Sequence, residues 1–232
     1  MIKNILVLLL VLGCLASCKK DTTVITDHSP EFSPMSVGKY FIYNVDSISF
    51  DDVTMTSDTI HYQVQEILDS VFIDDTGNEA YRIERSRRKD STDVWLITDV
   101  WSCNLSSATS EKVEENLRFI KLSFPIYENR QWAGNKYIHP WDATEYLSDW
   151  NYEYKNVNTT ALVGSISFDS SLTVIQHIDS NLTEKYFFIE KFARHVGMIY
   201  KEEQHVQKQN LDPGWDHPES GFIRRYYLTD HN

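Results

Sequence analysis

Hydrophobic and polar residues alternate over short stretches along most of the chain, from residue 37 onwards. The clearest case is Ile60-His61-Tyr62-Gln63-Val64, in which every second residue is apolar. A period of two places successive side chains on opposite faces and is typical of a β-strand with one buried face. The pattern therefore predicts a protein built from strands.

The same alternation predicts a series of further strands. They are residues 38–45, 71–73, 81–83, 93–101, 117–124, 150–157, 162–168, 172–178, 185–192, 198–206 and 222–228. Asp74-Asp75-Thr76-Gly77-Asn78 consists of turn-forming residues and predicts a hairpin turn. Residues 109–116 predict one helical turn, because Val113, Leu117 and Ile120 recur at spacings of four and three.

Short strands at hairpin spacing, without alternating helices, predict an all-β fold. We expect an antiparallel meander that forms either a sandwich or a curved, partly closed barrel. Aromatic residues make up 13% of the chain, which also favours a sheet-rich fold. A parallel α/β sheet is not favoured by this pattern.

The first 17 residues differ from the rest and have the parts of a secretory signal peptide. Lys3 precedes an apolar stretch that is too short to span a bilayer, which takes about 20 apolar residues. We therefore expect a signal peptide at residues 1–17. A flexible tether rich in Thr, Ser and Asp is expected at 18–34, and a single β domain at 35–232.

The charge and the reactive residues exclude several classes of function. The chain carries 22 basic and 34 acidic side chains, and such an acidic surface repels phosphates, so nucleic acid is not an expected partner. No His-x-x-x-His spacing occurs, and no catalytic motif surrounds Cys103. We predict no cofactor, no metal site and no catalytic residue, and we expect Cys103 to be a reduced, structural thiol.

Two groups of residues are candidates for binding. The first consists of aromatic residues in or beside a long loop at 125–141, because binding residues concentrate in loops. These residues are Trp132, Tyr137, Trp141, Tyr146 and Trp150. The second group is a basic cluster in an acidic chain, which we interpret either as a docking site for an anionic partner or as charge that guards a strand edge. It contains Arg82, Arg85, Arg87 and Arg88, followed by Lys89.

Leu15-Ala16-Ser17-Cys18 resembles the lipobox of bacterial lipoproteins. The resemblance implies that Cys18 is acylated, for example with palmitate, and becomes the mature N-terminus. The alternative is an ordinary signal peptide that is cut elsewhere. Lys19-Lys20-Asp21 lacks an aspartate next to Cys18, and it is similar to the lysine-then-acidic signal of Bacteroidota surface lipoproteins. A lipid anchor in the outer membrane is implied, with the periplasmic or the cell-surface face left open.

Three stretches together resemble a family of Bacteroidota outer-membrane lipoproteins that has no established function. They are the Gly-aromatic segment at 37–43, the Phe-Pro segment at 122–126 with the following Gln131-Trp132, and the Val-Gly strand start at 193–202. The resemblance implies a mostly β, single-domain, membrane-anchored protein. It brings no catalytic residues to this chain.

These observations predict a non-enzymatic β domain that binds a ligand or a protein partner at the cell envelope. One alternative is a carrier or chaperone for hydrophobic ligands, which requires a large apolar cavity. A second alternative is a glycan-active enzyme, which requires two converging carboxylates in a cleft. We expect a contact with the membrane through the N-terminal lipid.

Overall fold

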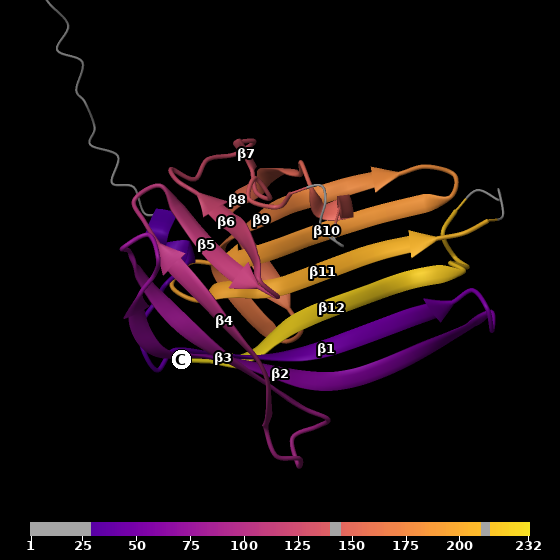
Figure 1. Ribbon diagram of the computed structural model, residues 1–232, viewed down its shortest axis with the longest axis horizontal. Helices are drawn as coiled ribbons and strands as arrows, with labels where there is room; N and C mark the ends of the chain where they lie inside the picture. The colour runs from indigo at the N-terminus through magenta and orange to yellow at the C-terminus, as the bar shows by residue number, and fades with distance from the viewer. Residues whose placement is uncertain (1–28, 140–144, 210–213) are drawn as a thin grey trace, which may run out of the picture.

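The computed structural model describes residues 29–139, 145–209 and 214–232, and these form one antiparallel sheet of 12 strands. The sheet curves until it is nearly closed into a barrel (Figure 1). This confirms the predicted all-β fold, and of the two predicted forms it is the curved, partly closed barrel. No helix in the described residues has the length and apolar character that a membrane span requires.

The strands and two short 3-10 helices follow one another with short connections. They are η1 (Ser29–Phe32), β1 (Tyr40–Asp51), β2 (Thr56–Ile73), β3 (Glu79–Arg88), β4 (Leu96–Leu105), β5 (Thr109–Glu114), β6 (Leu117–Ser123), β7 (Gln131–Ala133), η2 (Glu145–Leu147), β8 (Asn151–Val163), β9 (Ile166–Ser180), β10 (Glu184–Ala193), β11 (Gly197–Gln207) and β12 (Ser220–His231).

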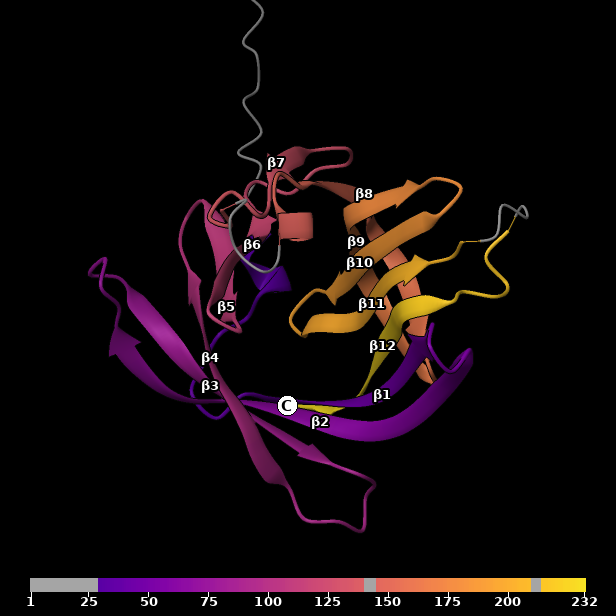
Figure 2. The ribbon, with the colours of Figure 1, turned by 45° about the vertical axis from the view of Figure 1, so that its right-hand side comes forward.

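The first and the last strand pair at the centre of the sheet, whose order is β6-β5-β4-β3-β2-β1-β12-β11-β10-β9-β8-β7. Tyr43 of β1 lies opposite both Val64 of β2 and Leu228 of β12. All three side chains are almost inaccessible to solvent, so the pairing of the two ends of the folded chain is buried. Figure 2 shows the strands running round a common interior, from β6 through β1 to β8 and β7.

The predicted hairpin turn joins β2 to β3. The Asp74 carboxylate accepts hydrogen bonds from the backbone N–H of Thr76 and of Asn78, each at 2.9 Å. It also accepts one from the Thr76 hydroxyl at 2.7 Å. These bonds stabilise the turn within the loop itself, as is typical of aspartate at the start of a turn.

The two end strands of the sheet, β6 and β7, share no ladder within the described residues, and the barrel is closed between β6 and the β7–β8 hairpin by individual hydrogen bonds from side chains and backbone. The Trp132 indole N–H donates to the carbonyl of Ile120 at 2.9 Å, and the Ile120 N–H donates to the carbonyl of Gly134 at 2.8 Å. The Tyr154 hydroxyl accepts from the Ser123 N–H at 2.8 Å and donates to the Ser123 carbonyl at 3.0 Å.

Two clusters of buried apolar side chains fill the interior at the end where η1 packs. The first cluster includes Tyr43 and Ile199, and the second includes Leu122 and Phe32. Phe32 is only 2% exposed, because η1 inserts it into the second cluster. The folded chain therefore already includes Ser29–Phe32, inside the stretch 18–34 that the sequence assigned to a tether.

Two predicted elements are wrong. Residues 109–116 form β5 and a turn at Glu115-Asn116, where both φ angles are positive, instead of a helical turn. The inward positions of β5 carry polar side chains such as Lys112, which hid its period of two. The strand predicted at 162–168 is interrupted by a turn at Gly164, whose φ is +57°, so it belongs to β8 and β9.

Candidate functional site

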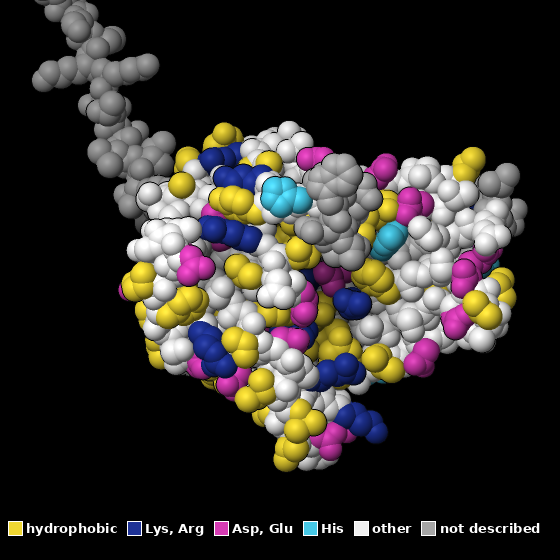
Figure 3. All heavy atoms as spheres, viewed as in Figure 1, with side chains coloured by type: hydrophobic (Ala, Val, Ile, Leu, Met, Phe, Trp, Pro, Cys, Tyr) yellow, Lys and Arg dark blue, Asp and Glu magenta, His cyan; other side chains and the backbone are white. Residues whose placement is uncertain are grey.

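The inward side chains change character along the strands, from apolar to charged to aromatic. Along β11 they are Ile199, Lys201, Glu203 and His205. Along β12 they are Leu228, Tyr226, Arg224 and Phe222. Figure 3 shows charged and hydrophobic side chains together in the hollow of this concave face. Residues two apart on a strand share one face, so both strands present the same order of chemistry to the interior.

We call the charged side chains of the concave face the charged array. It contains five acidic and five basic residues: Glu66, Asp99, Glu114, Glu190, Glu203, Arg85, Lys112, Lys121, Lys201 and Arg224. Each member lies within 4.0 Å of an oppositely charged member. The array is therefore electrically balanced.

The centre of the charged array connects the two sides of the barrel. Lys121 of β6 lies 2.8 Å from Glu190 of β10 and 3.2 Å from Glu114 of β5. Lys201 of β11 lies 3.7 Å from Glu114 and 2.8 Å from Glu203. Since β5 and β6 are far from β10 and β11 in the order of the sheet, these ion pairs hold the curved sheet together across its interior.

Glu114 and Lys201 of the charged array are held in their ionised forms. Burial by itself raises the pKa of Glu114, but Lys121, Lys201 and Lys112 outweigh it and hold that pKa well below its ordinary value of 4.5. Burial by itself lowers the pKa of Lys201, but Glu203 and other carboxylates raise it well above 10.5. These two charges are therefore stabilised by their neighbours despite their burial.

The charged array leaves two buried polar atoms without a hydrogen-bond partner among the described residues. They are Oε2 of Glu190, whose side chain is 1% exposed, and Nε of Arg85. Unpaired polar atoms at buried positions cost about 1–3 kcal/mol each. These unpaired atoms reduce the contribution of the charged array to the stability of the fold.

A row of rings follows the charged array along the concave face, and we call it the aromatic row. It consists of Trp150, His177, Tyr186, His205 and Tyr146. Trp150 stacks on His177 with ring centroids 4.6 Å apart, and Tyr186 stacks on His205 at 4.4 Å. Tyr146, next to Leu147 in η2, lies over His205 at 5.1 Å.

Glu184 fixes one end of the aromatic row through hydrogen bonds. Its Oε1 accepts from the Tyr186 hydroxyl at 2.6 Å and from the Gln207 amide at 2.9 Å, and it lies 2.9 Å from Nε2 of His205. The hydrogen bond from Tyr186 is the main cause that lowers the pKa of Glu184 to about 2. The carboxylate therefore orients two rings of the row.

The structure places the predicted aromatic loop residues in different environments. Trp150 is only 5% exposed and therefore offers no surface to a ligand, because it packs between His177 and Phe188. Trp132 is half-buried against Tyr154. The remaining two described candidates, Tyr137 and Tyr146, are each 38% exposed, whereas Trp141 lies outside the described residues.

Of these candidates, Trp150 and Tyr146 meet in the aromatic row, while Tyr137 lies elsewhere. Its ring is contacted by the guanidinium of Arg118, 4.7 Å from the ring centroid, and by Lys136. The binding role predicted for the group stays a prediction. Cys18, the predicted lipidation site, also lies outside the described residues.

The basic cluster is divided between the two faces of the sheet. Arg85 and Arg87 point into the concave face, where Arg85 pairs with Asp99 at 2.8 Å. Arg82 and Arg88 occupy the alternate, outward positions of β3. The four side chains therefore do not form one continuous patch, and the predicted docking of an anionic partner stays a prediction.

Cys103 is a free thiol that is 8% exposed. Burial raises its pKa to about 12, so it is a neutral thiol at ordinary pH, as we expected of a structural cysteine. Within the described ranges, no three His, Cys, Asp or Glu side chains are placed to hold a metal ion.

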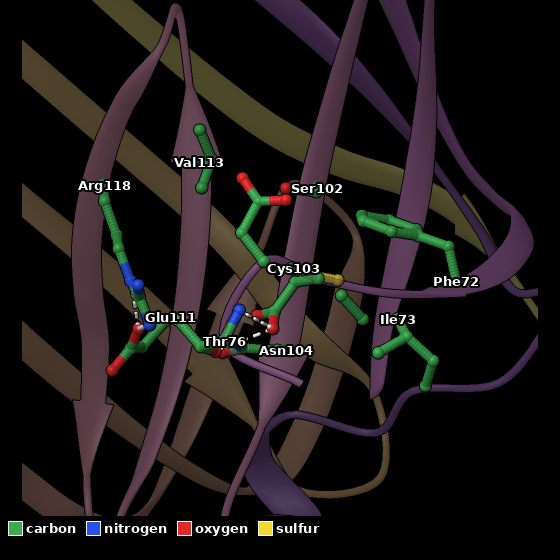
Figure 4. Close-up of a pocket in the computed structure, with 12 residues that line it drawn as sticks. Phe72, Ile73, Thr76, Ser102, Cys103, Asn104, Glu111, Val113 and Arg118 are labelled. Atoms are coloured by element: carbon green, nitrogen blue, oxygen red, sulfur yellow. Dashed lines mark hydrogen bonds and ion pairs between the residues drawn. The ribbon is translucent and has the colours of Figure 1, made fainter. Parts of the chain in front are cut away.

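A groove on the outer face lies over β2 to β6 (Figure 4). Its volume is about 360 Å³, and Phe72, Val113 and Arg118 are among its lining residues. A second hollow of about 510 Å³ shares Phe72 and Val113 and adds Val100. Both are open to solvent and combine apolar with charged lining.

Sequence reasoning missed the charged array and the histidines of the aromatic row. His177 lies in the strand predicted at residues 172–178, and its polar character gave no sign that it stacks on Trp150 inside the barrel. The available signal was the repeated Lys and Glu at alternate positions of strands, as in Lys112 and Glu114 or Lys201 and Glu203. Such residues normally mark a solvated face.

No known protein family matches the sequence, and no curated protein does so either. Among solved structures, the chain is similar to a candidate exported protein with a YmcC-like fold from Bacteroides fragilis. The match has 9% identity and a TM-score of 0.36, and covers 86% of this chain and 97% of that one. It is also similar to a candidate lipoprotein from Parabacteroides distasonis, with 12% identity and a TM-score of 0.34, over 87% of this chain and 98% of that one.

Proposed function

We propose that the protein is a lipid-anchored domain of the bacterial outer membrane that binds a ligand on its concave face without catalysing a reaction. The observation that carries this proposal is the position of Tyr146. Its ring is 38% exposed and lies over His205, while Tyr186 is 6.5 Å away. An exposed ring held by neighbouring rings, beside polar groups that fix orientation, is typical of a binding surface for ring-shaped polar ligands.

A carrier for hydrophobic ligands is less well supported by the interior. Such carriers need an apolar hollow of roughly 300–1,000 Å³. The cavity beside the apolar clusters has a volume of about 80 Å³, and Glu66, Lys112 and Lys121 contribute to its lining. A lipid chain placed there would meet charged groups in a small space, which disfavours its binding.

A glycan-active enzyme is also less well supported, although carboxylates do converge in the charged array. Glu114 lies 3.7 Å and Glu190 lies 3.9 Å from the same ammonium group of Lys201. Glycoside hydrolysis requires one carboxyl group whose pKa is raised so that it donates a proton. Lysines instead hold the pKa of Glu114 well below its ordinary value, which removes it as a general acid.

The binding proposal is tested by comparing Tyr146→Ala with Tyr137→Ala. Both rings are 38% exposed, but Tyr137 lies outside the aromatic row. Screening the detergent-solubilised mature protein against an array of polysaccharides should reveal binding. Tyr146→Ala should weaken that binding about tenfold, a loss of about 1.4 kcal/mol of binding free energy, because it removes the ring on which the ligand stacks. Tyr137→Ala should leave the binding unchanged. Equal effects of the two substitutions would refute the proposed position of the site.

The anchor is tested separately by Cys18→Ser. Two or three acyl chains hold a domain at a membrane because each buried CH₂ contributes about 0.8 kcal/mol. The substitution should move the protein from the detergent phase to the aqueous phase and abolish labelling with a palmitate analogue. Unchanged partitioning of the variant would sink the lipoprotein interpretation.

A further inference from the structure

Arg87 lies over a ring on the concave face and has no carboxylate partner in the part of the chain that the structure describes. It occupies the position of β3 opposite Val64, which is fully buried, so its side chain starts from the inward face. Its guanidinium carbon lies 3.7 Å from the centroid of the Tyr62 ring. Within the described ranges, no Asp or Glu lies within ion-pair distance of Arg87, and its side chain is exposed.

Arg224 has a similar arrangement on β12. Its guanidinium carbon lies 4.5 Å from the centroid of the Phe222 ring. Its ion pair with Glu203 is long, at 3.9 Å, and its side chain is 43% exposed. A guanidinium that stacks on a ring through its flat face keeps the N–H groups at its edge free to donate.

The two arginines lie at the ends of one stretch of the concave face. Tyr226 lies two residues from Arg224 on the same strand, and Val45 of β1 is opposite both Tyr226 and Tyr62. Arg87 then lies on Tyr62. This stretch continues to the aromatic row. Burial raises the pKa of the Tyr146 hydroxyl group, and Glu203 and Arg224 lie near enough to affect that pKa as well.

Two other arginines of the barrel, Arg225 and Arg85, are engaged by carboxylates at short distance. Arg225, the neighbour of Arg224 that points to the outer face, donates from Nε to Glu202 at 2.7 Å. Arg85 donates to Asp99 at 2.8 Å. Arg87 and Arg224 therefore differ from these two in having N–H donors that no carboxylate holds at short distance and that are available to an external acceptor.

We propose that the ligand of the concave face is an acidic glycan, whose carboxylate or sulfate groups are bound by Arg87 and Arg224 while a sugar ring stacks on Tyr146. The proposal rests on the proposed binding function. Guanidinium groups bind carboxylates and sulfates through paired N–H donors, and a preorganised arginine loses little freedom when it does so. The overall negative charge of the protein does not prevent this, because charges beyond about 8 Å are screened at physiological salt.

The test measures binding of the detergent-solubilised mature protein to matched pairs of probes by titration calorimetry. The pairs are oligogalacturonate with its methyl ester, and dextran sulfate with dextran. Each pair keeps the sugar backbone and removes the charge. We expect at least one acidic member to bind at least tenfold more tightly than its neutral partner, and this preference to shrink as NaCl is raised from 50 to 500 mM.

Arg87→Gln and Arg224→Gln should each weaken binding of the acidic probe about fivefold or more and leave binding of the neutral probe unchanged. Arg225→Gln, on the outer face, is the matched control and should have no effect. Thermal melts of all three variants establish that they are folded.

Two results would overturn the acidic-ligand inference alone. The first is equal affinity for the acidic and the neutral member of each pair, with Tyr146→Ala still weakening the binding of both. The second is a preference for the acidic member that survives both arginine substitutions. Absence of binding to all four probes would count against the inference and the proposed binding face together.

Discussion

The apolar end of the barrel interior and the charged array lie on the same strands and the same face, yet one is held by apolar packing and the other by ion pairs. Ile199 and Leu228 are at most 1% exposed and pack in an apolar cluster. At the next inward position of each strand, two residues away, Lys201 and Tyr226 begin a polar region. Apolar burial stabilises a fold directly, whereas a buried ion pair gains little over an apolar pair of similar size.

The closing of this barrel therefore does not depend on apolar packing alone. Lys121 and Glu190 connect β6 to β10 at a place where an apolar contact would stabilise the fold at least as well. Buried ion pairs are retained in some proteins because they specify one arrangement of elements. We infer that this pair specifies how the β5–β6 end of the sheet meets β10 and β11.

The largest expected effect comes from breaking the charged array at its most buried member. Glu190→Ala leaves the ammonium groups of Lys121 and Lys201 with fewer carboxylates in a buried site. Removing one partner of a buried ion pair costs about 3–5 kcal/mol. The free energy of unfolding, measured by urea denaturation, should fall by that amount.

Its matched control is Glu153→Ala. Glu153 pairs with Lys155 at the same distance of 2.8 Å, but that lysine side chain is 35% exposed. Exposed ion pairs contribute about 0–1 kcal/mol. The double variant Glu190→Leu with Lys121→Met should recover most of the stability lost in Glu190→Ala. Equal losses for Glu190→Ala and Glu153→Ala would show that burial does not distinguish the array.

A comparable loss of stability is expected at the aromatic row. It distinguishes the buried rings of the row from the exposed ones. Trp150→Ala removes a ring that is 5% exposed and should cost about 3–5 kcal/mol. Tyr146→Ala and Tyr137→Ala remove rings that are 38% exposed and should each change stability by less than about 1 kcal/mol. Thermal melts of the three variants provide the comparison. A near-neutral Trp150→Ala would place that ring on the surface after all.

A smaller effect is expected where side chains close the barrel. Tyr154→Phe removes a hydroxyl that bonds both the N–H and the carbonyl of Ser123, and both groups are buried. Leaving buried backbone groups unpaired costs about 1–3 kcal/mol. Tyr40→Phe is the control, because its hydroxyl bonds Asp230 at an exposed site, and it should be neutral. Urea denaturation of both variants tests whether this closure contributes to stability.

Much of the fold follows from the alternation of residues, because a half-buried strand needs only a period of two. Strands such as β1, β6, β10 and β11 are therefore visible in the sequence. Alternation does not show which polar face lies inside, so Lys112 and Glu114 gave no sign that they line an interior. Long strands that bend at bulges, such as β2 at Asp69, also read as two short strands.

The site was predicted less well, for a related reason. The sequence drew attention to Tyr146 and Trp150 as aromatic residues near a loop, and the structure brings both into the aromatic row. Their partners His177, Tyr186 and His205 come from neighbouring strands that are distant in the sequence. Contacts of this kind depend on strand register, which a single sequence without turn geometry does not determine.

The smallest expected effect is the response of the charged array to acid. Glu114 has a pKa held well below 4.5 in the folded protein, while in the unfolded chain it takes up a proton near that value. A lowered folded pKa contributes stability above the unfolded pKa, and this contribution is lost as the pH falls. Between pH 6 and pH 4, Glu114 alone should account for a loss of about 1 kcal/mol. Urea denaturation at both pH values should show this loss in the native protein and a smaller one in Glu114→Gln, which has no carboxyl group to titrate. Identical pH dependence of the two proteins would contradict the assignment of Glu114 as an ionised member of the array.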